Sequence, residues 1–295
     1  MAINKMVITN GIFNDKELRL LVSFDENDNA IDLVDLDSAM VGTNHVATVE
    51  KVLNDIEACI VKLDCGEKGF IEFKKLVPES FLERHSEKKL VCQADKFYVK
   101  ITQDKKSTKP YSCSFVNPAD YKENDSGFIQ YYIENYATDN AQIITDLQDV
   151  AELDLNVRYY SDDEVSLWQL YGLTKLVDVA TSKVVHLKSG SNIVIEPTEA
   201  MTIIDVNSSK NYGKSSAYET NMEALKEIAH QLRLRAISGI IIVDLLKLSK
   251  EEEANLIHEA KAFFADDISK VAIHGFTHLG LLEITRSRNF SPFKI

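Results

Sequence analysis

Apolar and polar residues alternate in short runs along the first third of the chain, which is a pattern typical of β-strands. The runs Met6–Thr9, Leu18–Phe24 and Ala30–Val34 predict three strands, and the turn sequence Asp25–Asn29 separates the last two. Five more runs predict the strands of a small Greek-key barrel, namely Val46–Val52, Glu57–Leu63, Gly69–Phe73, Phe97–Thr102 and Tyr111–Phe115.

Helices and strands mix in the middle of the chain, after a predicted linker at residues 118–127. The pattern predicts a helix at Phe128–Tyr136 and strands at Gln142–Asp146 and Val157–Tyr160. Ser161 is followed three residues later by Glu164, which is the spacing of a capping box that opens a helix through about residue 171.

Two apolar strands near the C-terminus each end in an aspartate, Met201–Asn207 at Asp205 and Gly239–Asp244 at Asp244. An amphipathic helix at about Tyr218–Ala236 runs between them, and strand, helix, strand is the order of a crossover that makes the strands parallel. If the strands are neighbours, both aspartates lie at one sheet edge, roughly 5 Å apart at the backbone. Two carboxylates that close repel unless a cation lies between them, and Mg²⁺ is the cation that such oxygens favour.

Five segments of the C-terminal hundred residues resemble, in order and spacing, the catalytic part of the ribonuclease E/G family. They are Val194–Ser208, Thr220–Ala224, Gln231–Arg235, Gly239–Asp244 and Leu279–Arg288. The resemblance implies a mixed α/β (α+β) fold in four segments. Residues 1–37 and 118–190 would form a ribonuclease-H-like subdomain, residues 38–117 an inserted OB-fold RNA-binding barrel, and residues 191–295 a DNase-I-like catalytic subdomain.

The same resemblance implies a magnesium-dependent endoribonuclease that cleaves single-stranded RNA in RNA processing or mRNA decay. Asp205 and Asp244 would bind Mg²⁺, for which Mn²⁺ could substitute, and Asn207 would support the site. Metal-activated water would attack the phosphodiester and leave a 5′-phosphate on the downstream fragment. For either aspartate alone, the alternative is a turn or cap residue that ends a strand.

Six residues are predicted to contact RNA, namely Phe70, Lys106, Lys109, Arg233, Arg286 and Arg288. Phe70 would stack on a base, although a Phe after Gly in a strand also suits a barrel core. The two lysines lie in a barrel loop, where a merely solvated loop is the alternative. Arg233 lies near a helix end, where a basic side chain also favours the helix dipole.

The chain departs from the family pattern in several places. Only about ten linker residues stand where larger members carry a sensor for a 5′-monophosphate, so we expect no such stimulation. No cysteine follows Arg288, so zinc-linked assembly is not expected, which leaves a homodimer through another interface open. Ser209, Lys247 and Ile60 replace a glycine, an acid or amide, and an aromatic of the family, and these changes put full activity in question.

Composition limits the other assignments. The formal net charge of −13 argues mildly against a nucleic-acid-binding protein and predicts modest, salt-sensitive RNA affinity. The four cysteines, Cys59, Cys65, Cys92 and Cys113, lack Cys-x-x-Cys spacing, so reduced thiols are expected and a zinc site is not. No apolar run approaches the roughly 18 residues of a membrane span, so we expect a cytoplasmic protein without a membrane partner.

Two other functions stay open on the sequence alone. The first is a non-catalytic RNA-binding protein that keeps the ribonuclease E/G fold, which would bind RNA without magnesium. The second is a nuclease for DNA or an RNA–DNA hybrid, which a ribonuclease-H-like subdomain would suggest. No convincing carboxylate cluster in residues 1–36 or 118–190 supports the second.

Overall fold

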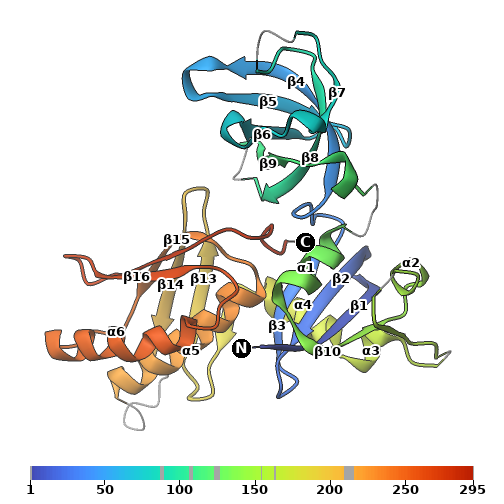
Figure 1. Ribbon diagram of the computed structural model, residues 1–295. Helices are drawn as coiled ribbons and strands as arrows, with labels where there is room; N and C mark the ends of the chain where they lie inside the picture. Colours follow the sequence, from blue (N-terminus) through green and yellow to red (C-terminus); the bar gives the residue numbers. More distant parts are fainter. Residues whose placement is uncertain are drawn as a thin grey trace. The chain divides into compact units, whose positions relative to one another are not determined.

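The chain forms two compact units. A computed structural model describes residues 2–86, 90–105, 109–122, 127–153, 155–162, 164–208 and 216–294. The first unit, called the sheet unit, comprises Met1–Asp37, Tyr136–Arg288 and Pro292–Ile295. The second, called the barrel unit, comprises Ser38–Asn135 and Asn289–Ser291. Figure 1 shows the elements of both units.

The barrel unit contains a closed five-stranded β-barrel, as predicted. Its strands are β4 (Asn44–Leu53), β5 (Ala58–Leu63), β6 (Lys68–Glu72), β8 (Lys96–Gln103) and β9 (Tyr111–Phe115). They pair in the order β4-β5-β6-β9-β8, and β8 returns to pair with β4 and so closes the ring. A short strand that the sequence did not reveal, β7 (Phe81–Glu83), pairs with β8. Short 3₁₀ helices occur at Asn54–Ile56, Phe73–Lys75, Pro78–Ser80 and Pro118–Asp120.

Gly69 allows the barrel to close tightly between β6 and β9. A Cβ atom at this position would lie 2.8 Å from both the Cys113 sulfur and a methyl group of Val61. Those distances are shorter than non-bonded atoms tolerate, so any larger residue would have to displace the barrel core. The alternation of the strand then directs Ile71 inward and leaves Phe70 on the outer surface.

Helix α1 (Gly127–Tyr136) follows the barrel and confirms the helix predicted there. Its residues Phe128 and Tyr132 pack against Phe290, with ring centroids 5.5 and 5.6 Å apart. The barrel unit therefore extends to Asn135 and includes a short segment near the C-terminus, whereas the predicted barrel ended at residue 117.

One sheet of the sheet unit has the strand order β11-β10-β1-β2-β3. The strands are β1 (Ile3–Phe13), β2 (Lys16–Phe24), β3 (Ala30–Asp35), β10 (Ala137–Thr145) and β11 (Val157–Tyr159). The first three form an antiparallel meander, whereas β10 runs parallel to β1 and β11 parallel to β10. Helices α2 (Gln148–Ala151), α3 (Leu167–Leu170) and α4 (Leu173–Thr181) belong to this part of the unit.

The capping box before α3 differs from the one predicted. Ser166 and Gln169 form it, with the Ser166 hydroxyl accepting from the Gln169 amide. The prediction of Ser161 and Glu164 was wrong because Asp162 organises a turn there, accepting from the backbone N–H of Glu164 and Val165. The helix that begins at Leu167 places Trp168 against Gly11, where even a Cβ atom would overlap the indole ring.

The second sheet has the order β12-β13-β14-β15-β17-β16. Its strands are β12 (Val184–His186), β13 (Asn192–Pro197), β14 (Met201–Asn207), β15 (Gly239–Asp244), β16 (Val271–Phe276) and β17 (Leu282–Arg286). Helices α5 (Ala217–Leu234) and α6 (Lys250–Phe264) pack on one face, where Ile204, Ile228, Ile241 and Leu256 belong to one buried cluster (Figure 1). Among its pairings, β14 and β15 are parallel, as predicted, and the others are antiparallel.

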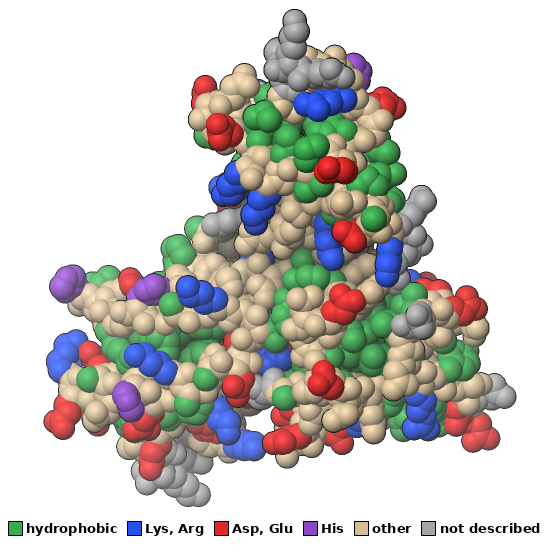
Figure 2. Space-filling view, viewed as in Figure 1, with side chains coloured by type: hydrophobic (Ala, Val, Ile, Leu, Met, Phe, Trp, Pro, Cys, Tyr) green, Lys and Arg blue, Asp and Glu red, His purple; other side chains and the backbone are tan. Residues whose placement is uncertain are grey.

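Charged side chains of both signs are interspersed over the face seen in Figure 2, without one large basic surface. All four cysteines are free, and Cys59 and Cys113 are buried in the barrel. Burial in the apolar barrel raises the pKa of each of these two thiols to about 12, so both stay protonated. None of the described helices is long and apolar enough to cross a lipid bilayer.

Candidate active site

Strand β14 presents its polar residues on the face opposite the helices. Thr202, Ile204 and Val206 are buried, because α5 and α6 cover that side. The alternating positions of a strand point to opposite faces, so Asp205 and Asn207 lie on the other, open face and are exposed. The sequence pattern had predicted this placement of an acid at the end of a buried strand.

Strand β15 repeats the pattern beside it. Ile241 and Val243 are buried, whereas Asp244 is exposed on the open face. The register is parallel and pairs Asp205 directly with Asp244. Their backbones are therefore separated by one strand spacing, about 4.8 Å, and both carboxylates stand on the same face. The structure brings together the two acids that the sequence placed at one sheet edge.

Asn207 is held beside the first acid. Its side-chain Nδ2 donates a hydrogen bond of 2.8 Å to Oδ2 of Asp205, and it lies 3.5 Å from Oδ1 of Asn192 on β13. That strand pairs Asn192 with Asn207 in the antiparallel register. The three side chains therefore form one polar row across β13 and β14, in which Asn207 orients the Asp205 carboxylate.

The acid pair fits a divalent cation with hard oxygen ligands. Within the described residues, no lysine, arginine or histidine forms an ion pair with Asp205 or Asp244. Adjacent carboxylates without such a partner favour a bound cation. Mg²⁺ commonly takes one or two protein carboxylates and completes its shell with water and substrate oxygens, which suits an exposed pair.

The helix between the two strands carries a side chain that positions the site. Asn221 of α5 is fully buried, donates from Nδ2 to the Leu246 carbonyl at 2.8 Å and accepts from the Leu246 amide at 2.9 Å. Leu246 comes two residues after Asp244, so the bonds hold the chain where it leaves β15. The sequence analysis did not assign this role. Its signal is an amide four residues before Leu225, on the apolar face of the helix.

Arg233 does not face RNA, and its prediction as an RNA contact was wrong. Its guanidinium makes two hydrogen bonds of 2.9 Å to the Asp32 carboxylate on β3, and both side chains are almost completely buried. A third bond of 3.0 Å reaches the Asp266 carbonyl. The arginine therefore connects α5 to the first sheet and to the segment before β16.

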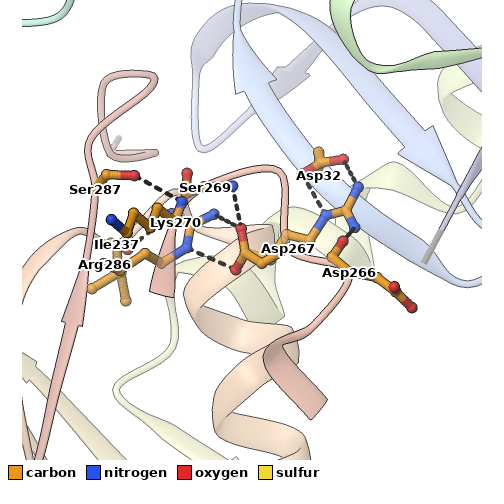
Figure 3. A network of polar contacts seen from close by, with 9 residues as sticks. Asp32, Ile237, Asp266, Asp267, Ser269, Lys270, Arg286 and Ser287 are labelled. Carbon is orange, nitrogen blue, oxygen red and sulfur yellow. Dashed lines mark hydrogen bonds and ion pairs between the residues drawn. The ribbon is translucent and has the colours of Figure 1, made fainter. Parts of the chain in front are cut away.

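Arg286 is also structural, so its prediction as an RNA contact was wrong as well. It forms a bidentate ion pair with Asp267, at 2.8 and 2.9 Å, and donates to the Ile237 carbonyl at 3.0 Å (Figure 3). Both partners of the pair are buried. Arg288 lies two residues further on, is partly exposed, and donates to the Ser238 hydroxyl at 3.1 Å. Its role as an RNA contact stays a prediction.

The outer surface of the barrel carries the stacking candidate. Phe70 on β6 is partly exposed and pairs with Ile60 on β5, so it is not part of the barrel core. Lys62 follows on the same face of β5, is exposed, and pairs across from Lys68. The sequence analysis missed Lys62, although its position two residues after Ile60 in an alternating strand indicated the shared face.

Only one of the two lysines predicted to contact RNA in the barrel loop can be placed. Lys109 is exposed, as a phosphate contact requires, whereas Lys106 lies outside the described residues. Their neighbour Lys105 forms an ion pair with Glu67, and that hydrogen bond raises its pKa despite partial burial. The Lys105 ammonium therefore interacts with the Glu67 carboxylate and with the ring of Tyr111.

One cluster in the barrel has a metal-binding composition, formed by His45, Asp64 and Cys65. The existing bonds explain it without a metal. His45 Nδ1 contacts Asp64 at 2.6 Å and Nε2 contacts the Thr43 hydroxyl at 2.8 Å, so both ring nitrogens are occupied. Asp64 also accepts from the backbone amides of Val46 and Cys65. These bonds fix the turn between β5 and β6.

One family model matches the part of the chain that contains these residues. The model of the ribonuclease E/G family matches residues 83–289, a segment that contains both aspartates and Asn207. A crystal structure of a multidomain protein with nucleic acid binding domains from Streptococcus pneumoniae covers 40% of this chain and 41% of its own, at 17% identity and a TM-score of 0.20. At that score the similarity says nothing about the fold.

Curated relatives match about half of the chain. Ribonuclease G of Haemophilus influenzae is 38% identical over 142 residues, which are 46% of this chain and 29% of that protein. Ribonuclease G of Escherichia coli K12 is 33% identical over 144 residues, which are 47% and 29% of the two chains. Ribonuclease E of Buchnera aphidicola subsp. Acyrthosiphon pisum is 34% identical over 137 residues, which are 45% and 15%. The match thus spans under a third of these relatives.

Because the family model covers more than half of this chain, the chain belongs to the ribonuclease E/G family.

Proposed function

We propose that the protein is a magnesium-dependent endoribonuclease that cleaves single-stranded RNA in RNA processing or decay. The observation that carries the proposal is the direct pairing of Asp205 with Asp244 on the open face of the sheet, with Asn207 bonded to the first acid. The names of the relatives, ribonuclease G and ribonuclease E, support RNA as the substrate.

Each residue of the site has a distinct task in this proposal. The carboxylates of Asp205 and Asp244 would hold Mg²⁺, with Mn²⁺ as a substitute. When bound, the ion would lower the pKa of water and neutralise the charge that develops on the phosphodiester. Asn207 fixes the orientation of the Asp205 carboxylate through its 2.8 Å bond, and Asn221 holds the chain that follows Asp244. Loss of such a supporting bond commonly lowers metal affinity or activity by roughly 10- to 100-fold.

The barrel would bind the RNA strand on its outer face. Phe70 offers a partly exposed ring for base stacking, and the exposed Lys62 and Lys109 offer positive charge for phosphates. Lys106 lies outside the described residues and stays a predicted contact. The finer fold assignment is part of the same proposal. The sheet β11-β10-β1-β2-β3 would correspond to the ribonuclease-H-like subdomain, the closed barrel to an OB-fold, and the six-stranded sheet to the DNase-I-like catalytic subdomain.

The first experiment is cleavage of a 5′-labelled, A/U-rich single-stranded RNA with Mg²⁺ and with EDTA. The Asp205→Asn and Asp244→Asn variants should lose the magnesium-dependent internal cuts, because a neutral amide binds Mg²⁺ much more weakly than a carboxylate does. Both side chains are exposed, so both variants should keep the melting temperature of the unmodified protein. Glu152→Gln, an exposed acid beside α2, is the matched control and should cleave normally.

Two results would contradict the proposal. Cleavage by Asp244→Asn at the normal rate would remove the two-acid assignment. RNA binding without any cleavage by the unmodified protein, unaffected by EDTA, would favour the non-catalytic RNA-binding protein. A parallel panel with single-stranded DNA and an RNA–DNA hybrid would test the remaining alternative.

A further inference from the structure

An apolar strip continues from the acid pair along the open face of the second sheet. Ile203 stands two residues before Asp205 on β14, and Ile240 and Ile242 stand on the same face of β15 before Asp244. Ile203 is 42% exposed and Ile240 is 45% exposed. A contiguous apolar patch that is bordered by polar residues commonly marks a binding surface.

The register places these side chains in two rows behind the acids. Ile203 pairs with Ile242, and Met201 pairs with Ile240. Each row is separated from the next by two residues along the strands, roughly 6.6 Å. That step is close to the length of one extended nucleotide, so successive rows can lie under successive nucleotides of a strand whose scissile phosphate is at the acids.

The charges beside the strip select which part of a nucleotide would contact it. Glu196 on β13 pairs with Ile203, and Glu283 on β17 pairs with Ile242. Both glutamates are exposed, and Glu196 is ion-paired with Lys183. The carboxylate of Glu283 repels phosphates from its side of the strip, whereas the uncharged faces of bases can cover apolar side chains.

We infer that Ile203, Ile242, Met201 and Ile240, here called the isoleucine strip, form a platform for the bases of the nucleotides next to the scissile phosphate. The inference rests on the proposed function and deepens it by naming positioning residues for the RNA. Because the strip offers no hydrogen-bonding side chain of its own, it positions bases without strict preference for their identity. The strand runs along β14 and β15, not across the sheet.

The test is an abasic scan of an RNA whose cleavage site has first been mapped. A single abasic ribonucleotide is placed at each position on either side of that site. For the unmodified protein, loss of the base at one or two adjacent positions on one side should lower kcat/KM about fivefold, by the loss of a base contact. A uniform response at every position would overturn the inference.

Variants of the isoleucine strip then test whether it causes the lower kcat/KM of abasic RNA. Ile203→Thr and Ile240→Thr keep a β-branched side chain in the strand but remove its apolar surface. Each should lower kcat/KM on intact RNA about fivefold, mainly by raising KM, and should abolish the extra penalty of the abasic nucleotide. The matched control is Val184→Thr on β12, a 38% exposed position on the same face, which should behave like the unmodified protein.

The outcomes separate the strip from the proposed function. Normal cleavage with an unchanged abasic penalty in Ile203→Thr would overturn the strip and leave the endoribonuclease standing. An effect of Val184→Thr as large as that of Ile203→Thr would place the RNA across the sheet and overturn the proposed direction. If no RNA is cleaved, a fivefold loss of RNA affinity in Ile203→Thr but not Val184→Thr would support the platform. Sedimentation that shows a dimer dispersed by Ile203→Thr would assign the strip to a second copy and overturn the inference.

Discussion

Single side chains decide the geometry of this site, and some of them act from beneath the sheet. Asp205, Asp244 and Asn207 are exposed, whereas Asn221 is fully buried and forms hydrogen bonds with the chain after β15. A buried amide that satisfies a backbone donor and a backbone acceptor cannot be truncated without leaving both groups unpaired. Its removal should therefore affect both the stability of the protein and the position of Asp244.

Asn221→Ala should lower the free energy of unfolding by about 1–3 kcal/mol, because the buried Leu246 amide and carbonyl lose their partner. It should also lower kcat at temperatures well below the melting transition. Asn255→Ala, at an exposed position of α6, is the matched control and should change neither quantity noticeably. Denaturant titration and single-turnover cleavage would check both, and full stability with full activity would exclude a positioning role.

Arg233 and Arg286 show a limit of predicting residue roles from sequence. Arg233 and Arg286 looked like RNA contacts because basic residues near a nuclease motif usually face phosphate. Their partners, Asp32 and Asp267, lie 201 and 19 residues away in the sequence, and nothing in the local pattern identifies them. By contrast, the pairing of Asp205 with Asp244 was predictable, because strand, helix, strand dictates both the parallel direction and the shared edge.

Helices and strands followed their hydrophobic pattern closely, and their ends less so. Strand β1 was predicted at Met6–Thr9 but extends over Ile3–Phe13, because its pairing with β2 continues through the non-apolar residues Lys5, Asn10 and Gly11. A helix was expected to end near residue 171, yet α4 begins directly after Gly172, whose left-handed backbone (φ +60°) separates it from α3. The pattern of apolar residues in the sequence does not reveal strand pairing of polar residues or a left-handed turn of this kind.

Helix α5 also carries a pH-sensitive contact with the first sheet. His230 contacts the Ala30 carbonyl on β3 at 2.8 Å and the Glu227 carboxylate at 3.4 Å. Burial lowers the pKa of His230, but the bonds to Glu227 and Ala30 outweigh it and leave the pKa raised above 6.5. A raised histidine pKa stabilises the fold below the unfolded value, and this contribution is lost as pH rises through the folded value.

The stability difference between the unmodified protein and His230→Gln should therefore be largest near about pH 6 and shrink towards about pH 9. Melting curves of both proteins at constant ionic strength would check this. Lys226→Gln, an exposed neighbour on α5, is the control and should show no such pH trend. A difference that stays constant over this range would show that the histidine charge does not contribute.

The whole molecule carries a net charge of −13, although the proposed substrate is a polyanion. On the face seen in Figure 2, charges of both signs are interspersed, so on that face attraction to RNA would come from local positions. On the barrel those positions include Lys62, which faces outward beside Ile60 and Phe70. Local attraction against an unfavourable overall charge makes binding modest and dependent on ionic strength.

Lys62→Gln should weaken RNA binding and reduce the slope of log affinity against log salt by about 0.7, the value for one phosphate contact on a single strand. Fluorescence anisotropy at several salt concentrations would measure both quantities. Lys175→Gln, which removes an exposed charge from α4, is the matched control and should leave the slope unchanged. Equal slopes for the two variants would place the phosphate contact elsewhere.

The division of the chain into its units has a consequence for synthesis on the ribosome. Strand β1 emerges well before its parallel partner β10, which begins at Ala137, and Asp32 has no ion-pair partner until Arg233 has been made. The barrel strands, from Asn44 to Phe115, are contiguous and can close in the interval. Until the later segments arrive, β1 has an open edge next to the apolar residues of the nascent meander. Strands β1 to β3 therefore need protection from aggregation during translation until β10 has been made.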